Sequence, residues 1–179
     1  MELLKALSQR FLQCGLELHP EKTKIIYCGD SKRRKRATLR KFSFLGYEFR
    51  GRKVTNRRTG EMFTSFTPAI CPKALKSIRQ DIRKEFSTLG SHISLETVAR
   101  HFNPRLRGWM NYYGHFSHTS LGNLSHYFNQ CLRNWARHKY GKLFRRRRAQ
   151  WKWLHNRFKE RPNMFAHWKF FKVCSMGAG

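Results

Sequence analysis

Acidic residues are scarce in this chain. Ten Asp and Glu stand against 38 Lys and Arg in 179 residues, which gives a formal net charge of +28 and a pI near 11.0. So much charge of one sign destabilises a compact chain through self-repulsion, and the composition therefore predicts a polyanionic partner. Charge alone does not distinguish RNA from DNA or from an anionic membrane surface.

The chain also lacks clustered carboxylates. Asp30 and Asp81 are its two aspartates, and they lie far apart in the sequence. Polymerases and many nucleases hold two metal ions about 4 Å apart with neighbouring carboxylates. Glu21 and Glu48 could approach each other in the fold, but the sequence offers no third acid to complete a metal site with them. The sequence therefore predicts no catalytic residues, no metal site and no cofactor in this chain, and a Ser-based hydrolase motif is absent as well.

Paired cysteines and long apolar runs are missing too. The five cysteines form no C-x-x-C pair, which argues against a zinc site and favours reduced thiols. His115, His118 and His126 have no cysteine pair or nearby carboxylate, so we expect structural or RNA-contacting roles for them. No run approaches the roughly 20 apolar residues of a membrane span, and no signal peptide is evident. We expect a cytoplasmic protein without a membrane partner.

The chain is nevertheless rich in aromatic residues, which indicates a folded domain. Aromatics make up 15% of the chain and hydrophobic residues 40%, more than a basic disordered arm would carry. Residues 1–67 read as a small α+β unit. This part contains an amphipathic helix ending at Gly15, a strand "TKIIY", a strand "FSFLGYEF" with a bulge at Gly46, and a hairpin around residues 58–60.

After Pro68 the hydrophobic period becomes helical. One stripe runs through residues 75, 78, 82, 86 and 89; Ser94 is a good N-cap for a second helix, and Pro104 is expected to open or kink the next segment. Further helices are predicted over residues 121–140 and from about residue 145 onward, and the apolar segment after residue 163 is expected to dock back. The predicted fold class is α+β, with a β-containing unit at 1–67, an all-α unit at 68–172 and a tail at 173–179.

Five short motifs, taken in order, resemble one family. They are "GLELHPEKTKI", "FSFLGYEF", "FNPRLRGWMNYY", "LRNWARHKYG" and "MFAHW". Together they are similar to the C-terminal half of group II intron-encoded reverse transcriptase/maturases. The first two resemble the end of the reverse-transcriptase palm. The region from about Pro72 to Trp168 resembles the thumb and the maturase domain, called domain X.

The resemblance implies an RNA-binding function. Members of the family stabilise folded intron RNA and assist its splicing, while the RNA performs the chemistry. The paired-aspartate box of the family's palm lies upstream of the matching motifs, so the resemblance implies no polymerase activity for this chain alone. Mg²⁺ would be needed only by an intact polymerase or by the intron RNA. The implied partners are structured group II intron RNA, DNA in a retrohoming complex and an upstream reverse-transcriptase fragment.

Basic residues in and around these motifs are the predicted RNA contacts. Lys and Arg neutralise phosphates, and exposed aromatic rings stack on unpaired bases. Trp109, Tyr112, Phe128, Leu132 and Trp135 are instead expected to pack in the core. The predicted RNA-binding residues are Lys22, Lys24, Arg33, Arg34, Lys35, Arg36, Arg105, Arg107, Asn111, Tyr113, Arg133, Arg137, Lys142, Arg145, Arg146, Arg147 and Arg148.

Three other interpretations stay open at this point. The chain would be an enzyme subunit if another polypeptide supplied the aspartates of a reverse transcriptase. It would be a remnant without a role if its palm strands had lost their sheet neighbours and exposed unpaired edges. A generic ribosome-binding or DNA-binding basic protein would explain the charge, but it would not explain the ordered motifs.

Overall fold

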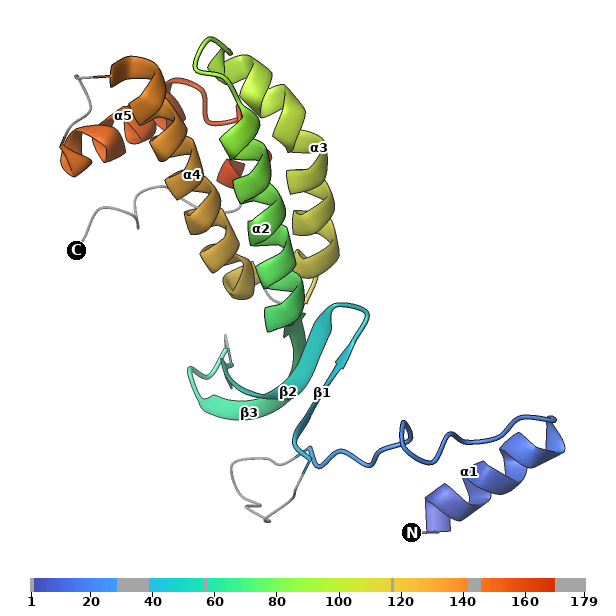
Figure 1. Ribbon diagram of the computed structural model, residues 1–179. Coiled ribbons are helices and arrows are strands. Elements are labelled where there is room, and N and C mark those ends of the chain that lie inside the picture. The colour runs from blue at the N-terminus through green and yellow to red at the C-terminus, as the bar shows by residue number, and fades with distance from the viewer. Residues whose placement is uncertain (1, 29–38, 57, 117, 142–145, 170–179) are drawn as a thin grey trace.

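A three-stranded antiparallel sheet precedes a bundle of helices, which confirms the predicted α+β class (Figure 1). The computed structural model describes residues 2–28, 39–56, 58–116, 118–141 and 146–169. Within these residues the elements are α1 (Glu2–Gln13), β1 (Lys41–Phe44), β2 (Tyr47–Thr55), β3 (Met62–Ile70), α2 (Pro72–Thr88), α3 (Leu95–Gly114), the 3-10 helix η1 (His118–Leu121), α4 (Gly122–Tyr140), α5 (Arg147–Glu160) and the 3-10 helix η3 (Ala166–Lys169).

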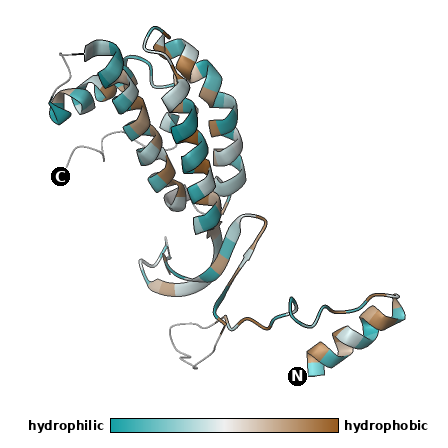
Figure 2. Ribbon diagram, in the orientation of Figure 1, coloured by the Kyte–Doolittle hydropathy of each residue, from teal (hydrophilic) through white to brown (hydrophobic). Residues whose placement is uncertain are grey.

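Helix α1 stands apart from the other elements. None of its residues is buried, and Figure 1 shows it joined to the sheet by a long extended segment. Its apolar side chains are largely open to solvent, including Leu3 at 84% and Leu12 at 67% exposure, and Figure 2 shows these brown segments alternating with hydrophilic ones. The helix predicted before Gly15 is therefore confirmed, but it takes no part in the core.

Strands β2 and β3 form the hairpin that the sequence predicts. Thr55 pairs with Met62 at its closed end, and the N–H of Gly60 donates to the carbonyl of Asn56 at 2.9 Å. Gly60 has a φ of +73°, a value that glycine adopts without strain. Strand β3 runs on through Pro68, where the sequence places the domain boundary, and ends at Ile70, two residues before α2 begins.

The segment Phe42–Phe49 is a second hairpin, so the prediction of one bulged strand is wrong. Leu45 and Gly46 both have positive φ, 47° and 78°, and link β1 to β2 as a two-residue turn. This turn twists in the same sense as its strands, which favours a tight hairpin over a continuous strand. The predicted strand "TKIIY" is also wrong: residues 23–27 pair with no strand among the described residues, although the N–H of Tyr27 donates to the carbonyl of Leu39 at 3.0 Å.

The β1–β2 turn docks on the C-terminal end of α3. Tyr112 Oη donates to the carbonyl of Leu45 at 2.9 Å, and Tyr47 Oη donates to the carbonyl of Tyr112. The rings of Tyr112 and Tyr113 lie 5.1 and 5.4 Å from that of Tyr47. The backbone N–H of Cys71 donates to the carbonyl of Gly46 at 2.8 Å. These contacts fix the sheet to the helical unit.

Gly46→Ala is expected to destabilise this junction by about 1–3 kcal/mol, because the new residue must hold a positive φ and its Cβ would lie 2.7 Å from Tyr113 Oη. Chemical denaturation measures the effect. Gly60→Ala is the control, because its φ is also positive while no atom lies within 4 Å of the added Cβ. Equal losses for both variants would show that the Tyr113 contact contributes nothing.

The helices begin and end where local chemistry dictates. Ser94 Oγ accepts from the N–H of Thr97 at 3.1 Å, as predicted for an N-cap, and Gly141 ends α4 with a φ of +58°. Pro104 does not open a new segment: it lies inside α3, which runs from Leu95 to Gly114. The packing of α3 on both sides of the proline outweighs the lost backbone hydrogen bond.

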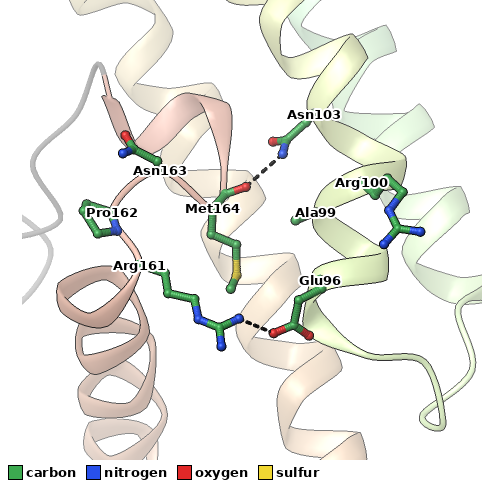
Figure 3. A pocket seen from close by; sticks show the side chains of 8 residues that line it. All are labelled: Glu96, Ala99, Arg100, Asn103, Arg161, Pro162, Asn163 and Met164. Carbon is green, nitrogen blue, oxygen red and sulfur yellow. Dashed lines mark hydrogen bonds and ion pairs between the residues drawn. The ribbon is translucent and has the colours of Figure 1, made fainter.

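The segment after α5 folds back onto α3, as predicted. Asn103 holds it with both ends of its amide: Nδ2 donates to the carbonyl of Met164 at 2.8 Å (Figure 3). Its Oδ1 accepts from the N–H of Ala166, also at 2.8 Å. Phe165 and Trp168 are thereby buried. Residues 170–174 of the predicted docking segment, and the predicted tail 173–179, lie outside the described residues.

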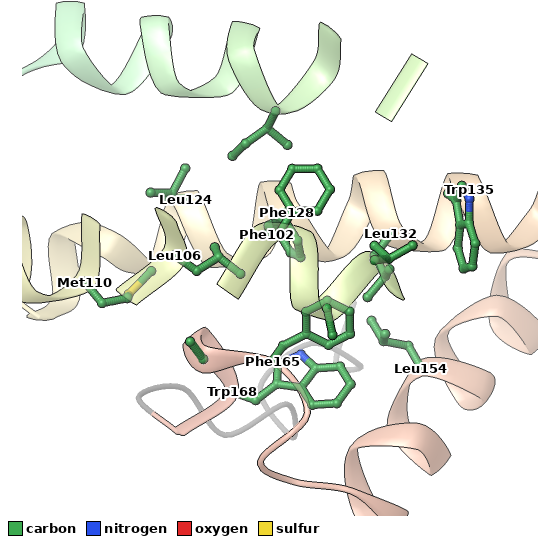
Figure 4. Close-up of a cluster of buried hydrophobic side chains, with 14 of the residues drawn as sticks. Phe102, Leu106, Met110, Leu124, Phe128, Leu132, Trp135, Leu154, Phe165 and Trp168 are labelled. Atoms are coloured by element: carbon green, nitrogen blue, oxygen red, sulfur yellow. The ribbon is translucent and has the colours of Figure 1, made fainter. Parts of the chain in front are cut away.

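The core lies between α2, α3, α4, α5 and the returning segment (Figure 4). Phe128 on α4 is fully buried against rings from three other elements. Leu132 and Trp135 follow it on the same face, so the three core assignments on α4 are confirmed.

The two aromatic residues of α3 that were predicted to be core differ from each other. Trp109 packs against the core from a half-buried position. Tyr112 is 48% exposed, so its assignment to the core is wrong; it serves the turn of the sheet instead.

Candidate nucleic-acid interface

The helical unit contains a long stretch without any acid. Residues 97–159 include 14 Lys and Arg and no Asp or Glu. This stretch covers nearly all of α3, the whole of α4, and α5 up to its last residue, Glu160. Glu96 and Glu160 flank this stretch, and Glu160 pairs with Arg157. Cations farther from its two ends have no carboxylate close by in the sequence, so any acid that neutralises them must come from elsewhere in the fold or from a ligand.

Arg105 on α3 forms an ion pair with an acidic residue of another helix. Its guanidinium forms a two-pronged ion pair with Glu85 of α2, and His101 Nε2 lies 2.8 Å from the same carboxylate. The hydrogen bonds from Arg105 are the main reason that the pKa of Glu85 lies below its usual value. Arg105 thus ties α3 to α2 and has little free charge to offer a phosphate. Arg107 and Asn111 are exposed on α3, while Tyr113 is half-buried at the sheet junction.

Arg133 on α4 is buried without an acid. Its exposed fraction is 9%, and its Nε and Nη1 are both inaccessible and have no hydrogen-bond partner among the residues that the structure describes. The guanidinium carbon lies 4.7 Å from the centroid of the Trp151 ring of α5. Burial, and after it the charges of Arg147 and Arg137, lower the pKa of Arg133. Of the two RNA contacts predicted on α4, Arg133 is therefore covered by Trp151, while Arg137 is exposed.

Helix α5 begins beside this buried cation. Its N-cap residue, Arg146, makes no capping hydrogen bond through its side chain, and the first turn contains no acid. Free N–H groups and the positive end of the helix dipole favour an anion there. Arg147 and Arg148 are exposed at the same end. An uncapped helix start and a buried guanidinium without a counter-ion thus lie together, and a bound phosphate would stabilise both.

Trp151 links the two helices of this surface, and the sequence does not reveal that role. It is half-buried, and His126 stacks near it with ring centroids 5.8 Å apart and planes at 26°. Gln130 Nε2 lies 2.8 Å from His126 Nε2. In the sequence, the spacing of residues 126, 130 and 133 is the one signal that these side chains share a face of α4. We call residues 126, 130, 133, 137, 146–148 and 151 the α4–α5 surface.

Comparison with protein-family models gave a match to part of the chain. A model described as the group II intron, maturase-specific domain matches residues 75–153. Residues 75–153 are therefore similar to the maturase-specific domain of group II intron proteins, and we call this range the maturase domain. Comparison with curated proteins and with solved structures gave no match. The matched range runs from α2 to the first half of α5, so it includes the α4–α5 surface of the maturase domain and excludes the sheet.

Other predicted contacts lie away from the maturase domain or cannot be placed. Lys22 and Lys24 are exposed in the extended segment between α1 and the sheet, apart from the helices in Figure 1. Six predicted residues lie outside the described part of the chain: Arg33, Arg34, Lys35, Arg36, Lys142 and Arg145.

The described residues offer neither a metal cluster nor a membrane-spanning helix. Among these residues, no group of three or more His, Cys, Asp or Glu side chains is arranged to hold a metal ion. Within the same part of the chain, no helix has both the length and the apolar character needed to cross a bilayer.

Proposed function

We propose that this protein binds folded group II intron RNA and assists splicing by stabilising the active RNA fold. The observation that carries the proposal is Arg133, a buried guanidinium with no acidic partner in the described structure, beside the uncapped start of α5. An RNA backbone phosphate bound at the exposed start of α5 would supply a counter-charge to this region without contacting the buried nitrogens of Arg133. The matched maturase domain points to intron RNA as the source of that phosphate.

Binding of this kind acts through the RNA. A protein that binds the folded RNA more tightly than its alternatives shifts the RNA population toward the folded state. We propose that the chain contributes no cofactor or metal of its own, and that the splicing chemistry belongs to the RNA. The sheet and α1 are proposed to be the end of a reverse-transcriptase palm, α2 to belong to the thumb, and the cytoplasm to be the site of action.

Arg147→Gln with Arg148→Gln is expected to weaken RNA binding and to flatten its dependence on salt. Each lost phosphate contact lowers the slope of log K against log salt by about 0.7–0.9. Both side chains are exposed, so the fold is retained. Filter binding to a folded group II intron RNA from 50 to 300 mM KCl measures the slope.

Lys5→Gln with Arg10→Gln is the matched control. It removes the same formal charge from exposed positions on α1, outside the maturase domain. The proposal requires a larger loss of affinity and of slope from the α5 pair than from the α1 pair. Equal effects would mean that net charge alone governs binding, and the α4–α5 surface would then have no special role.

A second function is favoured by the exposed apolar side chains of α1. Leu3 and Leu12 are more than half exposed, which is typical of a surface that another polypeptide covers. We propose as the alternative that a partner chain supplies the catalytic aspartates and that the pair copies RNA into DNA. Mixing this chain with a reverse-transcriptase palm fragment and measuring primer extension tests it; no gain over the fragment alone excludes it.

A further inference from the structure

A pocket of about 460 Å³ lies on the maturase domain between α3 and the segment that follows α5 (Figure 3). Glu96, Ala99, Arg100 and Asn103 line it from α3, and residues 161–164 form the opposite wall. Ala99 is buried, Met164 is half-buried, and Pro162 lies at the rim, so the lining includes apolar surface. The volume is sufficient for one planar heterocycle rather than for a peptide or a duplex.

The two walls are held in place by side-chain bonds. Arg161 Nη1 donates to Glu96 Oε1 at 2.5 Å across one end of the pocket. Asn103 bonds the backbone of the opposite wall at Met164 and Ala166 across the other end. Figure 3 shows both connections spanning the gap. A site fixed in this way loses little conformational entropy when a ligand enters.

The pocket contains one of the few acids of a strongly basic protein. Hydrogen bonding by its own backbone N–H, together with Ser94 and Arg161, lowers the pKa of Glu96, so the side chain is a carboxylate at neutral pH. A carboxylate repels phosphate and accepts from N–H donors, and its two oxygens have more lone pairs than the three donors just named use. Arg100 is exposed on the same face of α3. The pocket therefore suits a ligand whose ring is uncharged and has adjacent N–H donors, and whose backbone is anionic.

We infer that this pocket binds an unpaired guanine of the RNA, with the Glu96 carboxylate accepting from the base. The Watson–Crick edge of guanine offers two neighbouring donors, N1–H and the N2 amino group, which match the two oxygens of a carboxylate. Ala99, Met164 and Pro162 provide apolar surface for the ring, and Arg100 lies where it can meet a flanking phosphate. A basic peptide is the other ligand that a carboxylate attracts, but the net charge of +28 repels it. The inference rests on the proposed RNA-binding function.

Short single-stranded RNAs test the inference on the full chain. The probes are uridine heptamers with one central guanosine, inosine, adenosine or cytidine. Inosine keeps the N1–H of guanosine and lacks its N2 amino group. We expect the guanosine probe to bind about tenfold more tightly than the other three. Glu96→Gln removes the carboxylate with little change of shape and is expected to abolish this preference while leaving the salt slope unchanged.

Glu160→Gln is the matched control variant. Glu160 is also paired to an arginine at 2.5 Å, and its side chain is 51% exposed against 52% for Glu96, but it lies outside the pocket. The control is expected to keep the guanosine preference, and thermal unfolding checks that both variants fold. Binding of all four probes with equal affinity overturns the guanine site alone. Failure of the chain to bind any RNA, including the folded intron, overturns the proposed function as well.

Discussion

Phe128→Ala is expected to lower the free energy of unfolding of the helical unit by about 3–5 kcal/mol, because the lost side chain leaves a cavity that the packed helices cannot fill. Phe128 is fully buried. Its ring centroid lies 5.4 Å from that of Phe86, 5.1 Å from Phe102 and 5.7 Å from Phe165. The substitution therefore removes contacts with α2, α3 and the returning segment together. Urea denaturation followed by circular dichroism measures the loss.

Phe63→Ala is the control for this prediction. Phe63 lies on β3 and is 46% exposed, so its truncation is expected to cost less than about 1 kcal/mol. RNA binding by the Phe128 variant should fall only as far as the folded fraction falls. Comparable losses of stability for the two variants would contradict the assignment of Phe128 to the centre of the core.

The helices could be predicted from the sequence because their signals are local. The stripe from Leu75 to Leu89, the cap at Ser94 and the glycine at position 141 all lie within one or two turns of the element that they define. Tertiary packing agrees with each of them, so propensity and fold point the same way. The core residues of α4 could be predicted for the same reason, because a long helix with one apolar face buries that face.

The sheet was harder to predict because strand pairing depends on distant residues. Leu45 and Gly46 look like the interior of a strand, and the turn between them is stabilised by Tyr112 and Tyr113, more than 60 positions away. Pro104 looks like a helix breaker, and the packing of α3 overrides it. Neither outcome has a signal within a window of ten residues. The sequence alone could not arbitrate between local preference and these long-range contacts.

The candidate interface was predictable in charge but not in geometry. The basic run at residues 145–148 marks one edge of the α4–α5 surface. Whether an arginine is neutralised depends on which acid the fold brings to it. Arg105 meets Glu85, twenty positions away, whereas Arg133 is covered by Trp151 and meets no acid in the described structure. Two residues of the same type in the same basic unit thus have opposite roles, and their partners decide which is which.

A buried polar group in the same core makes stability sensitive to acid. His167 is fully buried, and its Nε2 lies 2.9 Å from Asn129 Oδ1, which also accepts from Trp168 Nε1 at 3.2 Å. Burial lowers the pKa of His167 from 6.5 to about 3. The imidazole therefore stays neutral in the folded protein over the range in which the unfolded chain takes up a proton.

Because the folded pKa lies below the unfolded value, the contribution of His167 to stability is complete above pH 6.5 and is lost progressively as the pH falls toward 3. Each unit of pH in that window costs up to about 1.4 kcal/mol, so the free energy of unfolding is expected to drop by about 2 kcal/mol between pH 7 and pH 5. His167→Gln removes this titration, and we expect the stability of this variant to vary less with pH even if it is lower at pH 7.

His138→Gln, at an exposed position on α4, is the control and should keep the full pH dependence of stability. Urea denaturation of the three proteins at pH 5, 6 and 7 measures the slopes. If the slope of the His167 variant matches those of the other two, the acid sensitivity arises from other groups.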